Sequence, residues 1–125
     1  MTISKEKIIE YFKSGIKEKK NFKIGIEHEK FLFNSKNNKR IDYSKVKEMF
    51  SALNEFGWRP IKEDENIVGL NKGGKNITLE PGNQVELSGE KLNNIHEACS
   101  ESYDYLFELK PVSYTHLTLP TTYTV

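Results

Sequence analysis

The sequence predicts an α+β fold in which helices pack on one side of a mostly antiparallel sheet. Three observations predict it. Apolar residues recur with a helical period in three segments, and short strand-like segments follow one another between the second and third of these. Turn residues separate the consecutive strand-like segments, which favours antiparallel neighbours. The length of 125 residues is enough for one modest domain and not for two.

The first two elements are a helix and a strand. Residues 4–20 carry an apolar stripe at helical spacing, and Ser4 is placed to cap the helix. The stripe consists of Ile8, Ile9, Phe12 and Ile16. Residues 22–33 read as a strand with an apolar residue at most alternate positions. The polar residues 34–40 then predict a loop.

A second helix is predicted over residues 44–56. Either Asp42 or Ser44 can cap its start, and Gly57 is placed to end it. Its apolar face consists of Val46, Met49, Phe50, Leu53 and Phe56. Trp58 follows at the junction to the next strand and is most simply a packing residue.

A block of strands and a third helix complete the chain. The segments "WRPI", "NIVGL" and "NITLEPGNQVELSG" predict the strands, and "NKGGK" predicts a hairpin turn. Residues 90–110 predict the helix, with Ser88 helping to cap it. We expect its packed face to consist of Leu92, Ile95, Cys99, Tyr103 and Leu106.

Composition excludes several classes of protein. The net charge is +1, from 19 basic and 18 acidic residues, so no strong field points to nucleic acid or to an anionic membrane. The single cysteine cannot form an internal disulfide, which fits a reducing compartment. No segment resembles a secretory signal or a membrane span. We therefore expect a cytoplasmic protein.

Residues 111–125 differ from the rest of the chain. They contain no Asp, Glu, Lys or Arg, whereas 30% of the whole sequence is charged. One interpretation is a β-prone tail that begins at Pro111. The interpretation we favour is a non-native tail, because "VSYTHLTLPTT" resembles translated adaptor sequence. The expected division is a domain portion over 1–110 and an anomalous tail over 111–125.

The stretch "GIEHEKFLF" places Glu27 and Glu29 two residues apart in the first strand. Residues i and i+2 of a strand face the same way, with carboxylates about 6–7 Å apart. Such anions repel one another unless water, a basic side chain or a cation lies between them. His28 projects to the opposite face and is expected to pack there. The pair therefore predicts either a solvated sheet surface or part of a cation site.

The stretch "LEPGNQVELSG" supplies two more carboxylates, Glu80 and Glu86. Pro81 and Gly82 predict a turn or bulge between them, so whether they share a face stays open. An ordinary hairpin with its polar residues toward water is the alternative. Clustered glutamates without pairs of Cys or His favour Mg²⁺ or Mn²⁺ over zinc. Bound Mg²⁺ would indicate phosphoryl chemistry on a nucleotide.

Two further patterns are weaker. His96 and Cys99 lie three residues apart on a helix, but two residues do not make a metal site, so a core or interface role is favoured. The "KGGK" stretch lacks the spacing of a phosphate-binding loop.

Four segments together resemble the N-terminal part of glutamate–cysteine ligase in its plant and proteobacterial form. They are "IGIEHEKFLF", "FGWRPI", "NIVGLNKGGKNITLEPGNQVELSG" and "LNNIHEACSE", and the resemblance runs over residues 22–110. It implies part of a glutamine-synthetase-like catalytic domain, incomplete in this chain. By that likeness Glu27, Glu29 and Glu86 are metal ligands and Glu80 is a catalytic carboxylate. The same likeness implies that Gln84 and Ser88 line the substrate pocket.

The resemblance also implies an activity. Family enzymes join the γ-carboxylate of glutamate to the amine of cysteine through a γ-glutamyl phosphate, using ATP and Mg²⁺ or Mn²⁺, in the first step of glutathione biosynthesis. They are several times longer, so this chain is expected to be a truncated and inactive fragment. Two alternatives stay open. One is a related ATP-dependent carboxylate–amine ligase with another amine acceptor, and the other is a stand-alone cation-binding α+β module.

Overall fold

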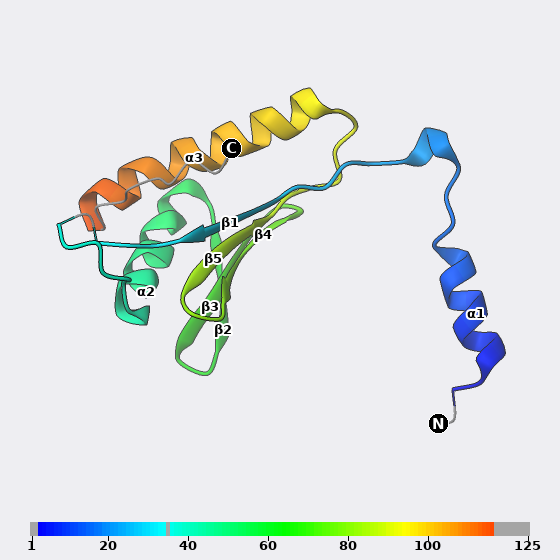
Figure 1. The fold of residues 1–125 in the computed structure, drawn as a ribbon, viewed down its shortest axis with the longest axis horizontal. Helices are drawn as coiled ribbons and strands as arrows, with labels where there is room; N and C mark the ends of the chain where they lie inside the picture. Colours follow the sequence, from blue (N-terminus) through cyan, green and yellow to red (C-terminus); the bar gives the residue numbers. More distant parts are fainter. Residues whose placement is uncertain (1–2, 35, 117–125) are drawn as a thin grey trace.

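The computed structural model describes residues 3–34 and 36–116 as an α+β fold (Figure 1). Five strands form one antiparallel sheet in the order β1-β5-β4-β3-β2. The strands are β1 (Glu27–Phe31), β2 (Arg59–Glu63), β3 (Asn66–Lys72), β4 (Lys75–Glu80) and β5 (Gln84–Ser88). The helices are α1 (Lys5–Ser14), α2 (Tyr43–Ala52) and α3 (Ile95–His116), with short 3₁₀ turns at Lys19–Asn21 and Leu53–Phe56. The fold class predicted from the sequence is confirmed.

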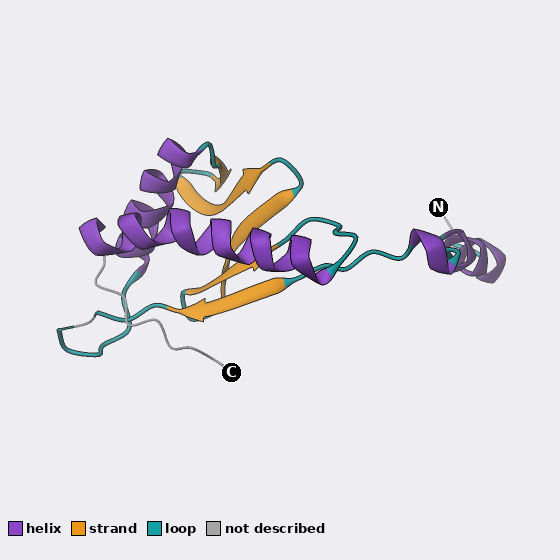
Figure 2. Cartoon of the chain, turned by 90° about the horizontal axis from the view of Figure 1, so that it is seen from above, coloured by secondary structure: helices purple, strands orange, loops and turns teal. Residues whose placement is uncertain are grey.

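Helices α2 and α3 cover one face of the sheet, as the two views at right angles show (Figures 1 and 2). The core lies between them and that face, and Trp58, Phe50, Leu70, Ile77 and Leu87 are among its fully buried members. No described helix covers the other face, which we call the open face. Alternate residues of β1 and β5 point to each face because side chains alternate along a strand.

The start and end of α2 follow from local chemistry. Asp42 is the N-cap, and its carboxylate accepts a hydrogen bond from the backbone N–H of Lys45 at 3.2 Å. Ser44 instead donates its hydroxyl to Asp42. Gly57 ends the following 3₁₀ turn with a φ of 85°, a conformation that glycine adopts without steric cost. Of the two predicted caps, the structure therefore selects Asp42.

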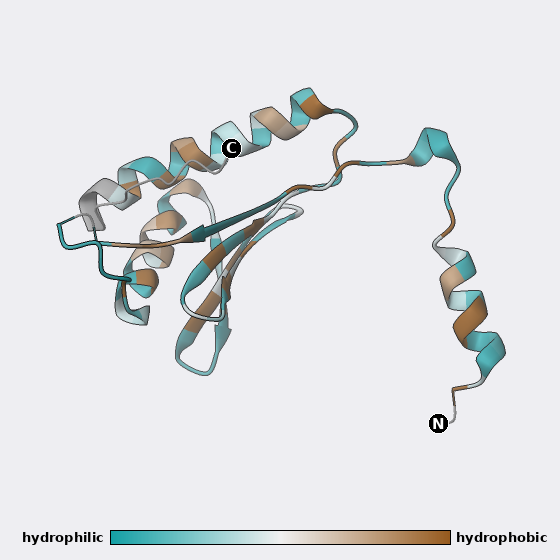
Figure 3. Ribbon diagram, in the orientation of Figure 1, coloured by the Kyte–Doolittle hydropathy of each residue, from teal (hydrophilic) through white to brown (hydrophobic). Residues whose placement is uncertain are grey.

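Helix α1 stands away from the sheet (Figure 1). None of its residues is buried, although Ile8, Ile9 and Phe12 form the predicted apolar stripe. Figure 3 shows hydrophobic positions along α1, and no other described helix or strand lies beside this helix. The helix ends at Ser14, and so it is shorter than the predicted 4–20.

Two predictions about α3 are wrong. The helix begins at Ile95, and the side chain of Asn94, rather than Ser88, accepts a backbone N–H in its first turn. The packed face is also different: Ile95 and Tyr103 are 60% and 70% exposed. The residues that pack toward the sheet are Ala98, Glu101, Tyr105, Leu109 and Val112. The helix carries two apolar stripes, and periodicity alone does not say which one meets the sheet.

Helix α3 continues through Pro111 to His116, so residues 111–116 do not begin a β-strand. Val112 is 4% exposed and belongs to the core. Residues 117–125 of the predicted tail lie outside the described part of the chain. The division of the chain at Lys110 stays a prediction. Within residues 3–34 and 36–116, none of the helices qualifies as a candidate membrane span.

Candidate functional site

The centre of the open face is a pair of opposed carboxylates. In the antiparallel register of β1 and β5, Glu29 lies directly opposite Glu86, and Glu86 lies opposite Thr78 of β4. Cβ atoms of directly opposed residues are about 4.5–5.5 Å apart, and like charges at such positions repel one another. The strands therefore bring two anions together from segments that are distant in the sequence.

Glu27 and Ser88 form the next row of the same face. Glu27 lies opposite Ser88, which lies opposite Asn76 of β4. The hydroxyl of Ser88 donates a hydrogen bond to Oε1 of Glu86 at 3.0 Å. This contact directs the carboxylate of Glu86 toward the row that contains Glu27.

Glu80 and Gln84 form the row on the other side of the central pair. Glu80 lies opposite Gln84, and it accepts a hydrogen bond at 3.0 Å from the hydroxyl of Thr78. Because Thr78 lies opposite Glu86, Glu80 and Glu86 share the open face. The structure thus decides a question that the turn at Pro81 and Gly82 left open.

Basic side chains of the described residues do not neutralise the carboxylates of the open face. No ion pair among the described residues involves Glu27, Glu29, Glu80 or Glu86. No group of three Asp, Glu, His or Cys side chains in the described part of the chain is drawn together closely enough to hold a metal ion. The face is therefore an open array of oxygen donors, and its members share one surface without converging on a point.

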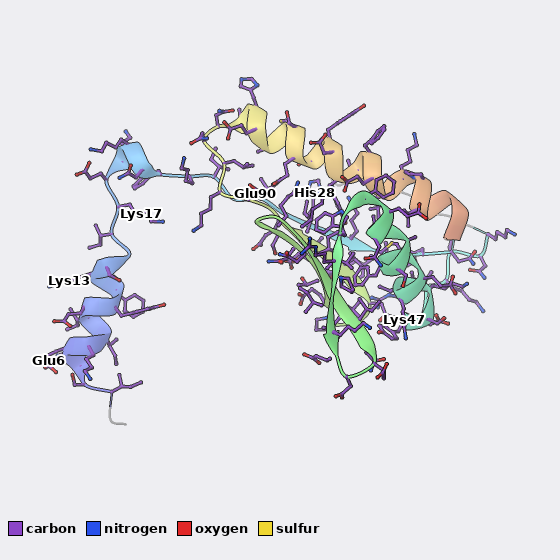
Figure 4. The ribbon with its side chains drawn as sticks, turned by 180° about the vertical axis from the view of Figure 1, so that it is seen from behind. Glu6, Lys13, Lys17, His28, Lys47 and Glu90 are labelled. Carbon is purple, nitrogen blue, oxygen red and sulfur yellow. The ribbon has the colours of Figure 1, made fainter. Side chains whose placement is uncertain are left out.

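The opposite face of β1 is packed. His28 lies between β1 and α3, with its ring centroid 6.3 Å from that of Tyr105 (Figure 4). Burial lowers the pKa of His28, with a smaller contribution from the nearby charge of Lys30. Nδ1 of His28 and the hydroxyl of Tyr105 are buried without a hydrogen-bond partner among the described residues. His28 packs away from the carboxylates, as the alternation of β1 predicts.

The remaining residues singled out in the sequence lie away from the carboxylates of the open face. His96 and Cys99 are exposed on α3, so of the expected core or interface role the core role is wrong, and the interface role stays a prediction. Gly73 and Gly74 form the predicted hairpin turn between β3 and β4. Trp58 is 2% exposed and packs in the core, as predicted.

Sequence reasoning missed two residues of the open face: Thr78, which lies opposite Glu86, and Arg40, whose guanidinium lies over the ring of Phe31. Thr78 could have been found, because alternation along "NITLE" places it on the same face as Glu80. Arg40 lies in a stretch read only as a polar loop, where no periodic signal exists.

Comparisons with a family model and with known proteins all match glutamate–cysteine ligases. Residues 23–116 match the family model described as glutamate-cysteine ligase family 2. The chain is 40% identical over 111 residues to glutamate–cysteine ligase A, chloroplastic, of Oryza sativa subsp. japonica. The aligned residues make up 88% of this chain and 23% of that protein. It is 38% identical over 112 residues to the chloroplastic glutamate–cysteine ligases of Nicotiana tabacum and Arabidopsis thaliana, with 89% of this chain and 22% of each relative covered. The chain therefore spans less than a quarter of the length of these relatives.

Proposed function

Since the chain belongs to glutamate–cysteine ligase family 2, we propose that it supplies part of the active site of an ATP-dependent ligase that joins the γ-carboxylate of glutamate to the amine of cysteine. The reaction would pass through a γ-glutamyl phosphate, which the cysteine amine attacks as phosphate leaves. It would serve the first step of glutathione biosynthesis.

One observation carries the proposal beyond the family match. Glu29 and Glu86 are opposed on the open face, and none of the described residues forms an ion pair with either of them. A sheet gains nothing from two unpaired anions at opposed positions, because they repel one another. A cation bound between them would remove that repulsion.

The donor set fits a hard cation. Glu27, Glu29 and Glu86 offer only carboxylate oxygens, which are the ligands that Mg²⁺ and Mn²⁺ prefer. We propose these three residues as ligands, with the set completed by substrate phosphates, water and groups outside the described residues. Bound Mg²⁺ would neutralise charge on the phosphates of ATP during phosphoryl transfer.

The neighbouring residues have proposed roles of their own. The hydroxyl of Ser88 holds the carboxylate of Glu86, so Ser88 orients a ligand as well as facing the substrate pocket. Glu80, held by Thr78, is the proposed catalytic carboxylate. Gln84 lies between Phe31 and Glu80 and offers an amide to a polar substrate.

A paramagnetic titration tests the metal ligands. Mn²⁺ added to the ¹⁵N-labelled chain should broaden the amide signals of β1 and β5 around Glu29 and Glu86. Glu29→Gln should remove this broadening, whereas Glu63→Gln, on the far edge strand β2, should leave it unchanged. Equal broadening in the Glu29→Gln protein would contradict the assignment.

An activity assay tests the reaction. We propose that the 125-residue chain alone does not release ADP with glutamate and cysteine, because it supplies only part of the site. A chimera of the Oryza sativa enzyme, in which this chain replaces the matched segment, should form γ-glutamylcysteine. Glu29→Gln in the chimera should abolish the activity. Turnover by the 125-residue chain itself would contradict the proposal.

The same materials separate the two alternatives. Preference of the chimera for an amine other than cysteine, when the parent enzyme prefers cysteine, would favour a related carboxylate–amine ligase. Tight Mg²⁺ binding by the isolated chain, with an inactive chimera, would favour a stand-alone cation-binding module. The relatives are named chloroplastic, and the cytoplasmic location expected for this chain stays a prediction.

A further inference from the structure

The backbone brings Arg40 to the end of the open face. Arg40 pairs with Phe33 in an isolated antiparallel bridge just beyond β1, and the next residue, Ile41, donates its N–H to Leu32 at 3.2 Å. Phe33 is four residues after Glu29, so along an extended chain the two side chains point to the same face. Leu32 and Ile41 are buried on the opposite face. Arg40 therefore emerges on the side of the sheet that carries the carboxylates.

The side chain of Arg40 reaches across the end of this face. Its guanidinium carbon lies 4.9 Å from the ring centroid of Phe31, and Nη2 donates a hydrogen bond to the carbonyl of Gly82. Phe31 lies opposite Gln84, and Gly82 belongs to the turn that joins β4 to β5. The guanidinium thus lies beside the row of Phe31, Gln84 and Glu80.

The turn is shaped around this side chain. Gly82 has a φ of 76°, and a Cβ at this position would lie 2.8 Å from Nη2 of Arg40. Asn83, with a φ of 58°, donates its side-chain amide to the carbonyl of Ile41 at 3.1 Å. Two left-handed residues and two hydrogen bonds therefore fix the guanidinium relative to the sheet.

The charge of Arg40 meets the ring of Phe31 and the carbonyl of Gly82, and neither of these groups neutralises it. No carboxylate of the described residues lies within ion-pair distance of it. Glu80 accepts from Thr78 and Glu86 accepts from Ser88, and in the register of β4 and β5 both hydroxyls lie on the side away from Arg40. A guanidinium carries five N–H donors in a planar fork, and the carbonyl of Gly82 uses only some of them.

We propose that Arg40 binds an oxyanion at the end of the open face. The planar fork matches a group with two coplanar oxygens, either a carboxylate or an edge of a phosphate. Its identification as a group of a ligase substrate rests on the proposed function. The face would then carry two complementary parts: carboxylates that bind a cation and, one row beyond them, a fixed guanidinium that binds an anion.

The test is an anion titration of the 125-residue chain without divalent cations. Inorganic phosphate and L-glutamate are added separately at constant ionic strength, and the ¹H–¹⁵N signals of Arg40 Nε–H and of the Gly82 amide are followed. Arg40→Gln should raise the Kd of the binding anion about tenfold, the cost of losing a charge-assisted hydrogen bond. The matched control is Arg59→Gln, which removes the same charge from the far edge of the same face, opposite Asn71.

The outcomes of the titration either identify the anion that Arg40 binds or overturn the proposal. Dependence on Arg40 with phosphate alone identifies a phosphate subsite, and dependence with glutamate alone identifies a carboxylate subsite. An equal loss in the Arg40→Gln and Arg59→Gln proteins, or no shift at Gly82 with either anion, would overturn the proposal. If Arg40→Gln fails to fold, Arg40→Lys keeps the charge without the fork, and an unchanged Kd in that variant would overturn it.

The titration is independent of the metal experiment. Anion binding through Arg40 without Mn²⁺ broadening at β1 and β5 would refute the proposed metal ligands and leave the anion site standing. Mn²⁺ broadening without anion binding would refute the anion site and leave the proposed metal ligands standing.

Discussion

The indole N–H of Trp58 donates a hydrogen bond to Oε2 of Glu108 at 2.7 Å, which joins the start of β2 to α3. The other oxygen of Glu108 pairs with Lys72 at the end of β3, and the ammonium of Lys72 lies 5.7 Å from the centroid of the Trp58 ring. The Glu108 side chain is only 16% exposed, so solvent screens the contact less than it screens a surface ion pair. One carboxylate thus ties the long helix to both strands at the far edge of the sheet.

Glu108→Ala should destabilise the chain by about 2–3 kcal/mol. The substitution leaves the buried indole N–H and the half-buried ammonium of Lys72 without their partner. Urea unfolding followed by the fluorescence of Trp58, the single tryptophan, measures the change. Asp104→Ala, an exposed change on the same helix, is the control, and an equal loss in both proteins would contradict the prediction.

Glu29→Gln should stabilise the metal-free chain by about 0.5 kcal/mol at low ionic strength. The substitution removes the repulsion between opposed carboxylates at Glu29 and Glu86. The gain should shrink as salt is added, because salt screens exposed charges. Thermal unfolding in a chelator measures it, and Glu63→Gln on β2 should give no gain.

Gly82→Ala should cost about 1–3 kcal/mol. The residue holds a positive φ, which is strained for alanine, and the new methyl group would press against the guanidinium of Arg40. Gly25→Ala is the control, because its Cβ would meet nothing within 4 Å and its φ is not in the left-handed region. Similar unfolding midpoints for the two variants would show that the turn accommodates a side chain.

Glu97 should make stability depend on pH in the acid range. Its pKa is lowered, first by the backbone N–H of Asn93 and then by the side-chain amide of Asn93. A carboxyl with a lower pKa in the folded chain contributes stability that is complete above the unfolded value, near 4.5, and is lost as the pH falls through the folded value. Carboxyl ¹³C shifts should give a titration midpoint below 4.5, and Glu97→Gln should flatten the acid limb of the unfolding curve.

Local patterns predicted much of the open face, and tertiary geometry decided the rest. The alternation of Glu27 and Glu29 is a property of any strand, so it could be read directly. The shared face of Glu80 and Glu86 depends on the left-handed residues Gly82 and Asn83, which let the turn restore the pairing of β4 with β5. Pro81 and Gly82 predict a turn, but strand alternation alone does not say which residues pair across it.

The errors on α3 and the omission of Arg40 have separate physical reasons. Helix α3 has one apolar stripe through Tyr105 and Leu109 and another through Ile95 and Tyr103, and only the sheet beneath it distinguishes them. Arg40 acquires its position from Phe31 and Gly82, and the second of these lies far along the chain. The periodic spacing of residues in the sequence does not predict contacts between such distant segments.

The strand order has a consequence for how the chain folds. Strands β2 to β5 form a meander whose members are joined by short turns, whereas β1 pairs only with β5, which follows all the others. Loop closure for β1 is therefore the longest in the sheet and should come late. In refolding experiments, substitutions within the meander should slow folding, whereas substitutions in β1 should mainly speed unfolding. The carboxylates of β1 and β5 would then meet only in the last step.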